Sequence, residues 1–275
     1  MKKYKLTDES IVYNDYTLYR IECINAFDNV KVGDKGGWLE KECNLDTSGN
    51  AWVYDNAKVF GNAKVTGNAK VSGDACVSGD ACVSGNVNVF SNAWVSGNAK
   101  VFGNAKVFGN ACVSGNAKVC NNTCVSGDAW VSGTAWVSGN AKVSGNAKVF
   151  GTAWVSGNAK VSGNAWVTGN AKVCDNTCVS GDACVSGNAW VTGNAWVSGN
   201  AEINSDCDYM VFKNNWSSGR YFTWTKSNNM WQVGCFYGTG EELIRKAYGE
   251  SKLKGKCYEK VVNFVKELEE IKNNC

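Results

Sequence analysis

A small residue recurs at every sixth position along more than half of this chain, from Ala51 to Ala201. Each small residue is followed two positions later by Val or Ile. The register continues through twenty-six consecutive units without an insertion, and three units replace the Ala, at Val87, Thr123 and Thr177. A period this regular restricts the chain to a repeat architecture in which each unit packs on its neighbours.

The spacing within one unit predicts a short strand followed by a sharp corner. The small residue and the Val lie two apart, so both face inward while the residue between them faces outward. The Gly-Asn, Gly-Asp or Gly-Thr that follows supplies the positive φ of a corner, which Gly and Asn adopt at least cost. Three units then close one triangular coil. The repeat predicts between eight and nine stacked coils, a prism about 40 Å long at roughly 4.8 Å per coil.

This pattern resembles the hexapeptide-repeat family of left-handed parallel β-helices. In that family an aliphatic residue is followed four positions later by a small one, as Val143 is by Ala147 here. The resemblance covers more than half of the chain and implies a mainly β, left-handed β-helix. One departure is the residue after the aliphatic one, usually small in the family and Ser in most units here. Five units carry Phe there, and we expect these rings to form external ridges at corners: Phe60, Phe90, Phe102, Phe108 and Phe150.

The flanking segments add a narrower resemblance. Residues 17–45, TLYRIECINAFDNVKVGDKGGWLEKECNL, are similar to the N-terminal part of hexapeptide-repeat proteins encoded by phages and prophages. Residues 218–249, SGRYFTWTKSNNMWQVGCFYGTGEELIRKAYG, share that likeness. The resemblance suggests an origin in a phage or prophage and names no activity.

The chain divides into three parts on these patterns. We expect an N-terminal β cap at 1–44, the β-helix at 45–206 and a small α+β domain at 207–275, because an open β-helix end exposes unpaired strand edges. Three strand-like runs precede helices expected near 240–248 and 255–272. The last helix should present one apolar face, made of Val261, Val262, Val265, Leu268 and Ile271.

Outward residues eighteen apart fall on the same side of the prism, and two rows of Trp follow from that rule. One side alternates Cys with Trp94, Trp130 and Trp166, and on another side Trp136 and Trp154 should stack. An exposed apolar stripe more often marks an interface than a solvated surface, so we interpret these Trp as a partner-binding or self-association face. The alternative is the general preference of strands for aromatic residues. Trp rows can also bind sugars.

The C-terminal part offers a second candidate binding surface around Arg220, Trp224, Trp231 and Tyr237. Aromatic and Arg side chains dominate the energetic centres of protein interfaces, which favours this interpretation. The alternative is that these aromatic residues form the core of a small domain and the cap of the prism.

The composition argues against the familiar chemistry of this scaffold. The resemblance brings to mind acyltransferases with a histidine base and zinc carbonic anhydrases with histidine ligands, yet the chain has no histidine. Its absence removes Ser-His and Cys-His nucleophile pairs. The chain contains no phosphate-loop motif. In the segment that most resembles one, Thr239 and Glu242 are expected to form a helix capping box. We therefore expect no catalytic residue, no metal, no cofactor and no enzyme.

The net charge limits which partners the protein can bind, and the cysteine content indicates its cellular compartment. A net charge of +3 does not favour nucleic-acid binding, and no apolar run is long enough to span a membrane. Fourteen Cys without a secretion signal indicate a reducing compartment, here the cytoplasm of a host bacterium. Two VCxNTCV segments place Cys120 near Cys124 and Cys174 near Cys178, which we interpret as corner packing.

These observations favour a non-enzymatic phage-type scaffold that engages a host protein or protein complex, with inhibition of that host protein as one outcome. Binding would use the Trp and Cys face or the C-terminal domain, and homo-oligomers are a further expectation. The alternatives are a fibre-like component of a virion and a protein that binds a small molecule or a glycan.

Overall fold

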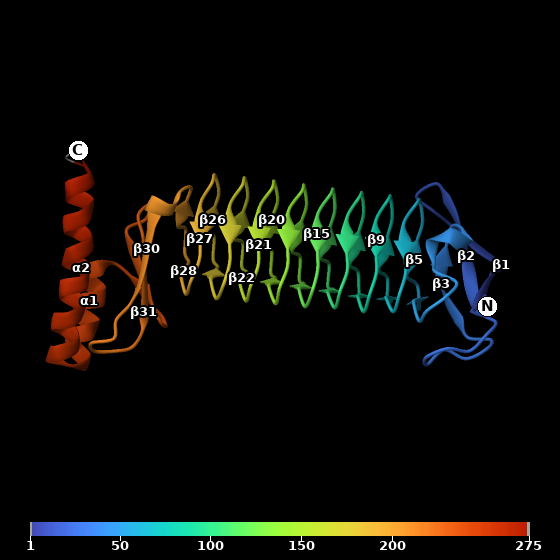
Figure 1. Cartoon of the computed structure of the whole chain (residues 1–275), viewed down its shortest axis with the longest axis horizontal. Helices are drawn as coiled ribbons and strands as arrows, with labels where there is room; N and C mark the ends of the chain where they lie inside the picture. Colours follow the sequence, from blue (N-terminus) through green and yellow to red (C-terminus); the bar gives the residue numbers. More distant parts are fainter. Residues whose placement is uncertain (1, 274–275) are drawn as a thin grey trace.

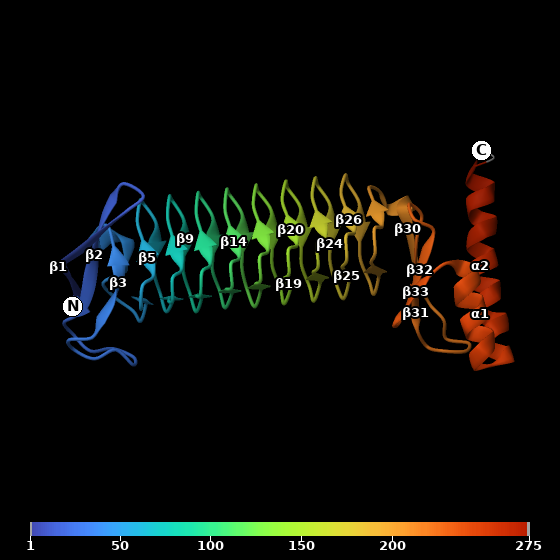
Figure 2. The same ribbon diagram turned by 180° about the vertical axis from the view of Figure 1, so that it is seen from behind.

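The computed structural model describes residues 2–273 and shows an elongated rod with three parts in a line (Figure 1). The N-terminal strands lie at one end, the repeats form the shaft, and a sheet with two helices closes the other end. The view from behind shows the same order, with the two termini at opposite ends of the rod (Figure 2).

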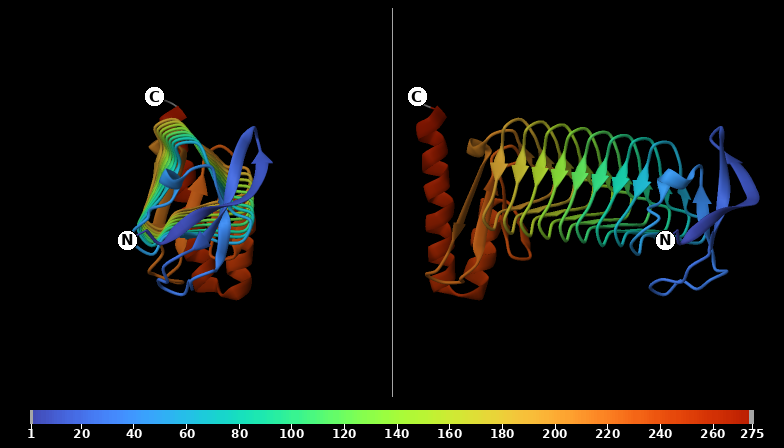
Figure 3. Two further views of the ribbon diagram at one scale, coloured as in Figure 1. Left: turned by 90° about the vertical axis from the view of Figure 1, so that its right-hand side faces the viewer. Right: turned by 45° about the vertical axis from the view of Figure 1, so that its right-hand side comes forward.

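Each six-residue unit of the shaft supplies one two-residue strand, from β4 (Trp52–Val53) to β29 (Glu202–Ile203). A strand pairs in parallel with the strand three units later, as β19 (Lys142–Val143) does with β22 (Lys160–Val161). Three units therefore make one coil, and the coils superpose when the rod is viewed along its axis (Figure 3). The shaft is the left-handed parallel β-helix expected from the repeat.

The strands form three faces, which we call the first, second and third face. The first face contains β5 (Lys58–Val59), β8 (Cys76–Val77), β11 (Trp94–Val95), β14 (Cys112–Val113), β17 (Trp130–Val131), β20 (Lys148–Val149), β23 (Trp166–Val167), β26 (Cys184–Val185) and β29. The second face contains β4, β7 (Lys70–Val71), β10 (Asn88–Val89), β13 (Lys106–Val107), β16 (Cys124–Val125), β19, β22, β25 (Cys178–Val179) and β28 (Trp196–Val197). The third face contains β6 (Lys64–Val65), β9 (Cys82–Val83), β12 (Lys100–Val101), β15 (Lys118–Val119), β18 (Trp136–Val137), β21 (Trp154–Val155), β24 (Lys172–Val173) and β27 (Trp190–Val191).

The inward residues behave as the repeat predicts. Ala and Val of the units form one continuous core in which residues such as Val143 and Ala147 are 0% exposed. At the corners Gly139 has a φ of 72°, and a Cβ built there would lie 2.8 Å from the carbonyl oxygen of Gly157 in the next coil. Coils can therefore stack at hydrogen-bonding distance because the corners lack side chains.

Between successive coils, the backbone N–H groups of the two residues that flank each Val donate in the same direction. The N–H of Lys142 donates to the carbonyl oxygen of Ala159 over 2.9 Å, and the N–H of Ser144 donates to Val161 over the same distance. These N–H groups of each coil point toward the C-terminal end of the rod, and the carbonyl groups that accept them point toward the N-terminal end. It follows that the first coil presents free carbonyl groups and the last coil presents free N–H groups.

The N-terminal part forms an antiparallel sheet that joins the first face. It consists of β1 (Tyr4–Tyr13), β2 (Tyr16–Cys23) and β3 (Lys35–Leu39), followed by a 3-10 turn at Glu42–Asn44, and β3 pairs in parallel with β5. The β1–β2 hairpin covers Phe60, which is 5% exposed and contacts Tyr13 and Tyr16.

The expectation that all five corner Phe residues form external ridges is therefore wrong for Phe60, because a segment distant in sequence covers it. Phe102 is 37% exposed. Phe90 and Phe108 stack on each other with ring centroids 4.8 Å apart.

The C-terminal part is a four-stranded antiparallel sheet packed against two helices. After a 3-10 turn at Asp206–Asp208 it contains β30 (Tyr209–Lys213), β31 (Tyr221–Thr225), β32 (Met230–Val233), β33 (Phe236–Gly238), α1 (Gly240–Glu250) and α2 (Lys252–Asn273). The expected capping box is confirmed, since Thr239 Oγ1 accepts from the Glu242 N–H and Glu242 accepts from the Thr239 N–H.

A helix that crosses a membrane must be long and apolar along its length. Neither α1 nor α2 is long and apolar enough to cross a membrane.

Candidate functional site

The first face carries the row of Trp predicted from the sequence. The strands pair in register, so that Trp94, Trp130 and Trp166 alternate with partly buried Cys112 and with Lys148 along one line. These Trp side chains are 40%, 48% and 44% exposed. Each indole therefore presents about half of its surface outward.

The indole N–H groups of two Trp residues in this row form hydrogen bonds within the protein. Trp94 Nε1 donates to Ser78 Oγ over 3.3 Å, and Trp130 Nε1 donates to Ser114 Oγ over 3.1 Å. The acceptor is in each case the corner residue of the preceding coil. Because these N–H groups are satisfied, Trp94 and Trp130 lie along the face and offer mainly their apolar rings to a ligand.

The third face holds the predicted pair of Trp136 and Trp154. Their rings stack with centroids 5.6 Å apart and an interplanar angle of 15°, which confirms the expected stacking. Trp136 Nε1 donates to Cys120 Sγ over 3.2 Å. The ammonium group of Lys118 lies 5.6 Å from the centre of the Trp136 ring, within the range of a cation–π contact.

A shallow hollow of about 230 Å³ lies between Trp130 and Trp166 on the first face. Phe150 contacts Trp166 edge to face, and the Lys148 ammonium lies 4.8 Å from the centre of the Trp166 ring. The hollow thus combines apolar walls with a positive charge at its edge. Such a surface suits a partner that offers an apolar side chain beside a carboxylate.

The structure does not bring the predicted C-terminal residues together into one surface. Trp224 and Trp231 pair across β31 and β32 and are only 5% and 2% exposed, because they belong to the core between the sheet and the helices. The prediction that they form a binding surface with Arg220 and Tyr237 is therefore corrected. Arg220 is exposed and lines a hollow of about 240 Å³ at the end of the shaft.

Tyr237 fastens the C-terminal domain to the shaft. A Cβ built on Gly199 of the last coil would lie 1.9 Å from the Tyr237 hydroxyl oxygen, so the two residues are in direct contact. Asn228 Nδ2 donates to the same hydroxyl over 3.2 Å and to Asn200 Oδ1 over 3.2 Å. Tyr237 therefore acts at the junction and is less free to bind a partner.

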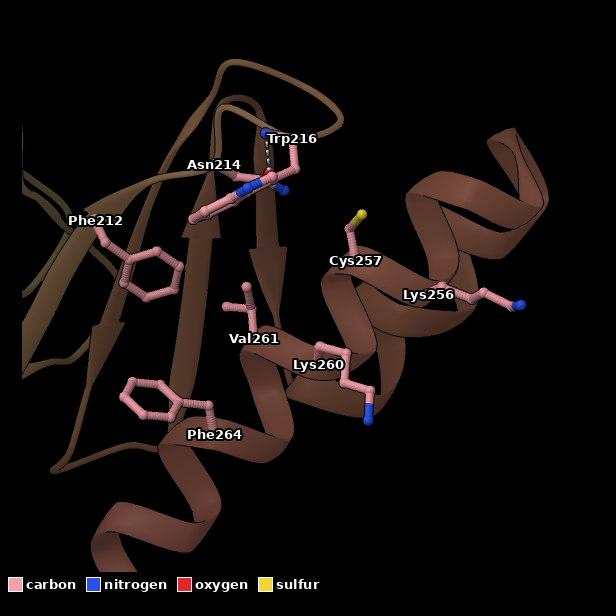
Figure 4. A pocket seen from close by; sticks show the side chains of 8 residues that line it. All are labelled: Phe212, Asn214, Trp216, Lys256, Cys257, Lys260, Val261 and Phe264. Carbon is pink, nitrogen blue, oxygen red and sulfur yellow. Dashed lines mark hydrogen bonds between the residues drawn. The ribbon is translucent and has the colours of Figure 1, made fainter.

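A further hollow, in the C-terminal part, was not foreseen from the sequence. It has a volume of about 490 Å³ and lies between β30, the loop that follows it and α2 (Figure 4). Figure 4 shows the rings of Phe212, Trp216 and Phe264 around it, with Val261 pointing inward from the helix and the two Lys side chains pointing away. The Trp216 side chain at this hollow is 76% exposed. Its full lining is Phe212, Asn214, Trp216, Lys256, Cys257, Lys260, Val261 and Phe264.

Four thiols on the shaft are weakly acidic because they are buried. Burial raises the pKa of Cys76 to about 11, and burial also raises the pKa of Cys112, Cys178 and Cys184. The thiolate is the nucleophilic form, so these groups are weak nucleophiles at neutral pH. All cysteines in the described part of the chain are free.

The VCxNTCV corners have a packing role. Thr123 replaces Ala in the core, is 0% exposed, and donates its hydroxyl to the carbonyl oxygen of Cys120 over 2.5 Å. Thr177 repeats this contact with Cys174 over 2.6 Å. Within residues 2–273 no group of three or more Cys, Asp or Glu is arranged to hold a metal ion.

Comparisons with known proteins give a narrow result. No protein-family model matches the chain. A relative from Escherichia coli strain K12 called uncharacterized acetyltransferase YdcK is 33% identical over 63 residues, which are 20% of this chain and 19% of that protein. The chain thus spans about a fifth of the length of this curated relative. The solved structure of LpxA from Acinetobacter baumannii is 10% identical and covers 66% of this chain and 78% of its own, with a TM-score of 0.30.

The relative agrees with the repeat class expected from the sequence and leaves a phage or prophage origin open. It also shows that one expectation is wrong. The chain is expected from its lack of histidine not to be an enzyme, whereas a relative that shares part of its sequence is described as an acetyltransferase. Histidine is the commonest acid/base residue, but other side chains perform the same task, so its absence does not exclude catalysis.

Proposed function

We propose that this protein is a rigid scaffold that binds another protein through the Trp residues of its first face. The observation that carries the proposal is the row of Trp94, Trp130 and Trp166, half exposed on a shaft whose strands are fixed by continuous hydrogen bonding. Trp is the residue type most enriched at the energetic centres of interfaces. A rigid shaft adds affinity because little conformational entropy is lost on binding.

The chemistry of this face indicates the character of the partner. Lys148 lies over Trp166, so a partner should present apolar side chains flanked by acidic groups. The resemblance of the flanking segments to phage and prophage proteins suggests that this partner is a protein of the host bacterium. Binding of this kind is compatible with a catalytic activity elsewhere on the chain.

The test is capture of a partner from bacterial lysate with two matched triple variants. Trp94, Trp130 and Trp166 are replaced by Ser in the first variant, and Lys106, Lys142 and Lys160 of the second face are replaced by Ser in the control. All six side chains are exposed and point outward, and the three that are replaced in each variant lie on three different coils. We expect one stoichiometric host protein with the native chain and the Lys control, and at least tenfold less with the Trp variant.

A partner that the Trp variant captures as well as the native chain does would contradict the proposal. A further variant without residues 207–275 separates the shaft from the C-terminal domain. Loss of the partner in that variant alone would place the contact on the C-terminal domain, against the proposal.

Acetyl transfer is a second candidate function, supported by the description of the E. coli relative. The purified protein would be incubated with acetyl-CoA and a panel of amine and hydroxyl acceptors. Free CoA and acetylated acceptor should be quantified by chromatography, because exposed cysteines of the chain such as Cys207 would react with thiol dyes. Product that increases in proportion to protein concentration supports this candidate, and no product from any acceptor counts against it.

A further inference from the structure

Helix α2 has two apolar stripes, and only one of them packs inside the C-terminal domain. The inner stripe, formed by Tyr258, Val262 and Val265, is 1% to 3% exposed. On the outer stripe Phe264, Leu268 and Ile271 are 53%, 37% and 61% exposed, and Leu253 is 66% exposed. Cys257 and Val261 complete this outer stripe and are partly buried at the wall of the 490 Å³ pocket.

The spacing of the outer stripe is that of a helix that packs along another helix. From Cys257 to Ile271 the apolar residues follow one another at intervals of four, three, four and three, the heptad pattern of a coiled-coil seam. With Leu253 the stripe extends over about 27 Å of helix at 1.5 Å per residue. Figures 1 and 2 show α2 as the outermost element of the rod, with its C-terminal half extending past the sheet.

We propose that the outer stripe binds α2 of a second copy of this chain in antiparallel orientation, so that two rods join end to end. The stripe is self-complementary about a point between Val262 and Asn263. An antiparallel two-fold about this point places Val261 opposite Phe264 and Cys257 opposite Leu268, and brings Leu253 within one residue of the level of Ile271. A two-fold interface requires this reciprocal match, in which one surface patch fits its own copy.

The charges beside the stripe select the antiparallel orientation and this partner. Lys260 and Glu267 lie one after the other along the same edge of the outer stripe. The antiparallel two-fold brings Lys260 of each copy close to Glu267 of the other, which gives two ion pairs. In a parallel pairing in register the edges that carry Lys260 and Glu267 lie on opposite sides of the helix pair, so neither ion pair forms.

The pocket next to the stripe gives the dimer its apolar centre. Phe264 of the second copy would lie over Val261, at the mouth of the pocket between α2 and Trp216 (Figure 4). The Trp216 ring, exposed in one chain, would then cover the incoming helix. Exposed aromatic residues around a preformed apolar hollow are typical of the centre of an interface.

The test measures the oligomeric state of the full chain by sedimentation equilibrium under reducing conditions over a wide range of protein concentration. We expect a monomer–dimer equilibrium in the native protein. Leu268→Glu should leave only monomer, with an unchanged circular dichroism spectrum because this side chain is exposed. The matched control is Glu270→Lys, an exposed position of α2 off the outer stripe, which should dimerise as the native chain does.

A charge exchange makes the test specific for orientation. Lys260→Glu and Glu267→Lys should each weaken dimerisation by about tenfold, since each change turns two attractive pairs into two repulsive pairs. The double variant restores both pairs with reversed sign, so its dissociation constant should return close to the native value. A native chain that stays monomeric, a dimer that is insensitive to Leu268→Glu, or a double variant as weak as the single variants would each overturn the proposal.

Discussion

The two ends of the β-helix are closed by side chains of opposite chemistry. At the N-terminal end the first coil presents carbonyl groups, and the cap supplies donors. The Lys3 ammonium donates to the carbonyl oxygens of Ser48, Gly49 and Ala51 over 3.1, 3.1 and 2.8 Å. The Asn44 amide donates to two further carbonyl oxygens, of Gly61 and Ala63, over 3.0 and 2.9 Å.

At the C-terminal end the last coil presents N–H groups, and the cap supplies acceptors. The Trp190 N–H donates to Asp206 Oδ1 over 2.6 Å, the Trp196 N–H to Thr223 Oγ1 over 2.9 Å, and the Glu202 N–H to Ser227 Oγ over 2.7 Å. These three acceptors come from the segment after the last repeat. They lie where the carbonyl groups of a further coil would lie.

The difference follows from the direction of the hydrogen bonds along the shaft. Because the N–H groups that flank each Val donate toward the C-terminus, a cap at the first coil must supply donors for carbonyl groups and a cap at the last coil must supply acceptors for N–H groups. The two ends also differ in burial. Lys3 and Asn44 are 4% and 0% exposed, whereas of the three acceptors only Thr223 is buried, at 1%, and Asp206 and Ser227 are exposed to solvent. Water can replace the two exposed acceptors more easily than a buried donor, and Lys3 serves three carbonyl groups whereas the buried Thr223 serves one N–H, so the N-terminal contacts should contribute more to stability.

Lys3→Met should have the largest effect. It removes the donor of three carbonyl groups, while the buried methylene stem is retained. Burial lowers the pKa of Lys3 to about 8, so loss of the charge also relieves some desolvation. We expect the free energy of unfolding to fall by about 2 kcal/mol, measured by urea titration with amide exchange over residues 48–54.

The neighbouring Lys2→Met is the control for this change, because Lys2 forms an exposed ion pair with Glu42 and its loss should change stability by less than about 1 kcal/mol. Equal effects of the two substitutions would show that the carbonyl groups of the first coil do not depend on Lys3.

Thr223→Val should have a smaller effect at the other end. Val has the shape of Thr, so the packing of β31 is kept and only the acceptor for the Trp196 N–H is lost. We expect a loss of about 1 kcal/mol and faster amide exchange at Trp196. The Trp130 amide, bonded to Ala147 in the middle of the shaft, should exchange at the native rate. Faster exchange at both amides would mean that the substitution disturbs the whole rod.

The two caps also differ in how much of the shaft they cover. The reactivity of cysteine thiols measures this difference near neutral pH, where the protein stays folded. The β1–β2 hairpin covers Cys76, whose pKa is raised to about 11 by burial, whereas Cys207 beyond the last repeat is exposed. We expect iodoacetamide to modify Cys207 at pH 8 while Cys76 stays unmodified, as read by peptide mass spectrometry.

Reaction at Cys76 should begin only as pH approaches 11. The ordinary thiol pKa is 9.0, so the unfolded chain releases this proton first and the contribution of Cys76 to stability is lost as pH rises from 9 toward 11. Equal modification of both thiols at pH 8 would show that the hairpin opens freely.

The sequence was most informative where one pattern repeats. The Ala and Val positions, the coil of three units, and the stacking of Trp136 on Trp154 follow from periods of six and eighteen. It was less informative in the C-terminal domain. The strands and both helices were predicted, but Val261, Val262, Val265, Leu268 and Ile271 were assigned to one apolar face. The structure divides them, because α2 packs by Val262 and Val265 and leaves Leu268 and Ile271 exposed.

The sequence by itself therefore determined the β-helix, because each repeat is locally complete: an inward pair, a corner, and an identical neighbour three units away. Tertiary structure alone decided which ends, rings and faces are covered. Lys3 lies 48 residues from Ala51, and Thr223 lies 27 residues from Trp196. No period connects such residues, so the caps, the burial of Phe60 and Trp224, and the open stripe of α2 depend on how distant segments meet.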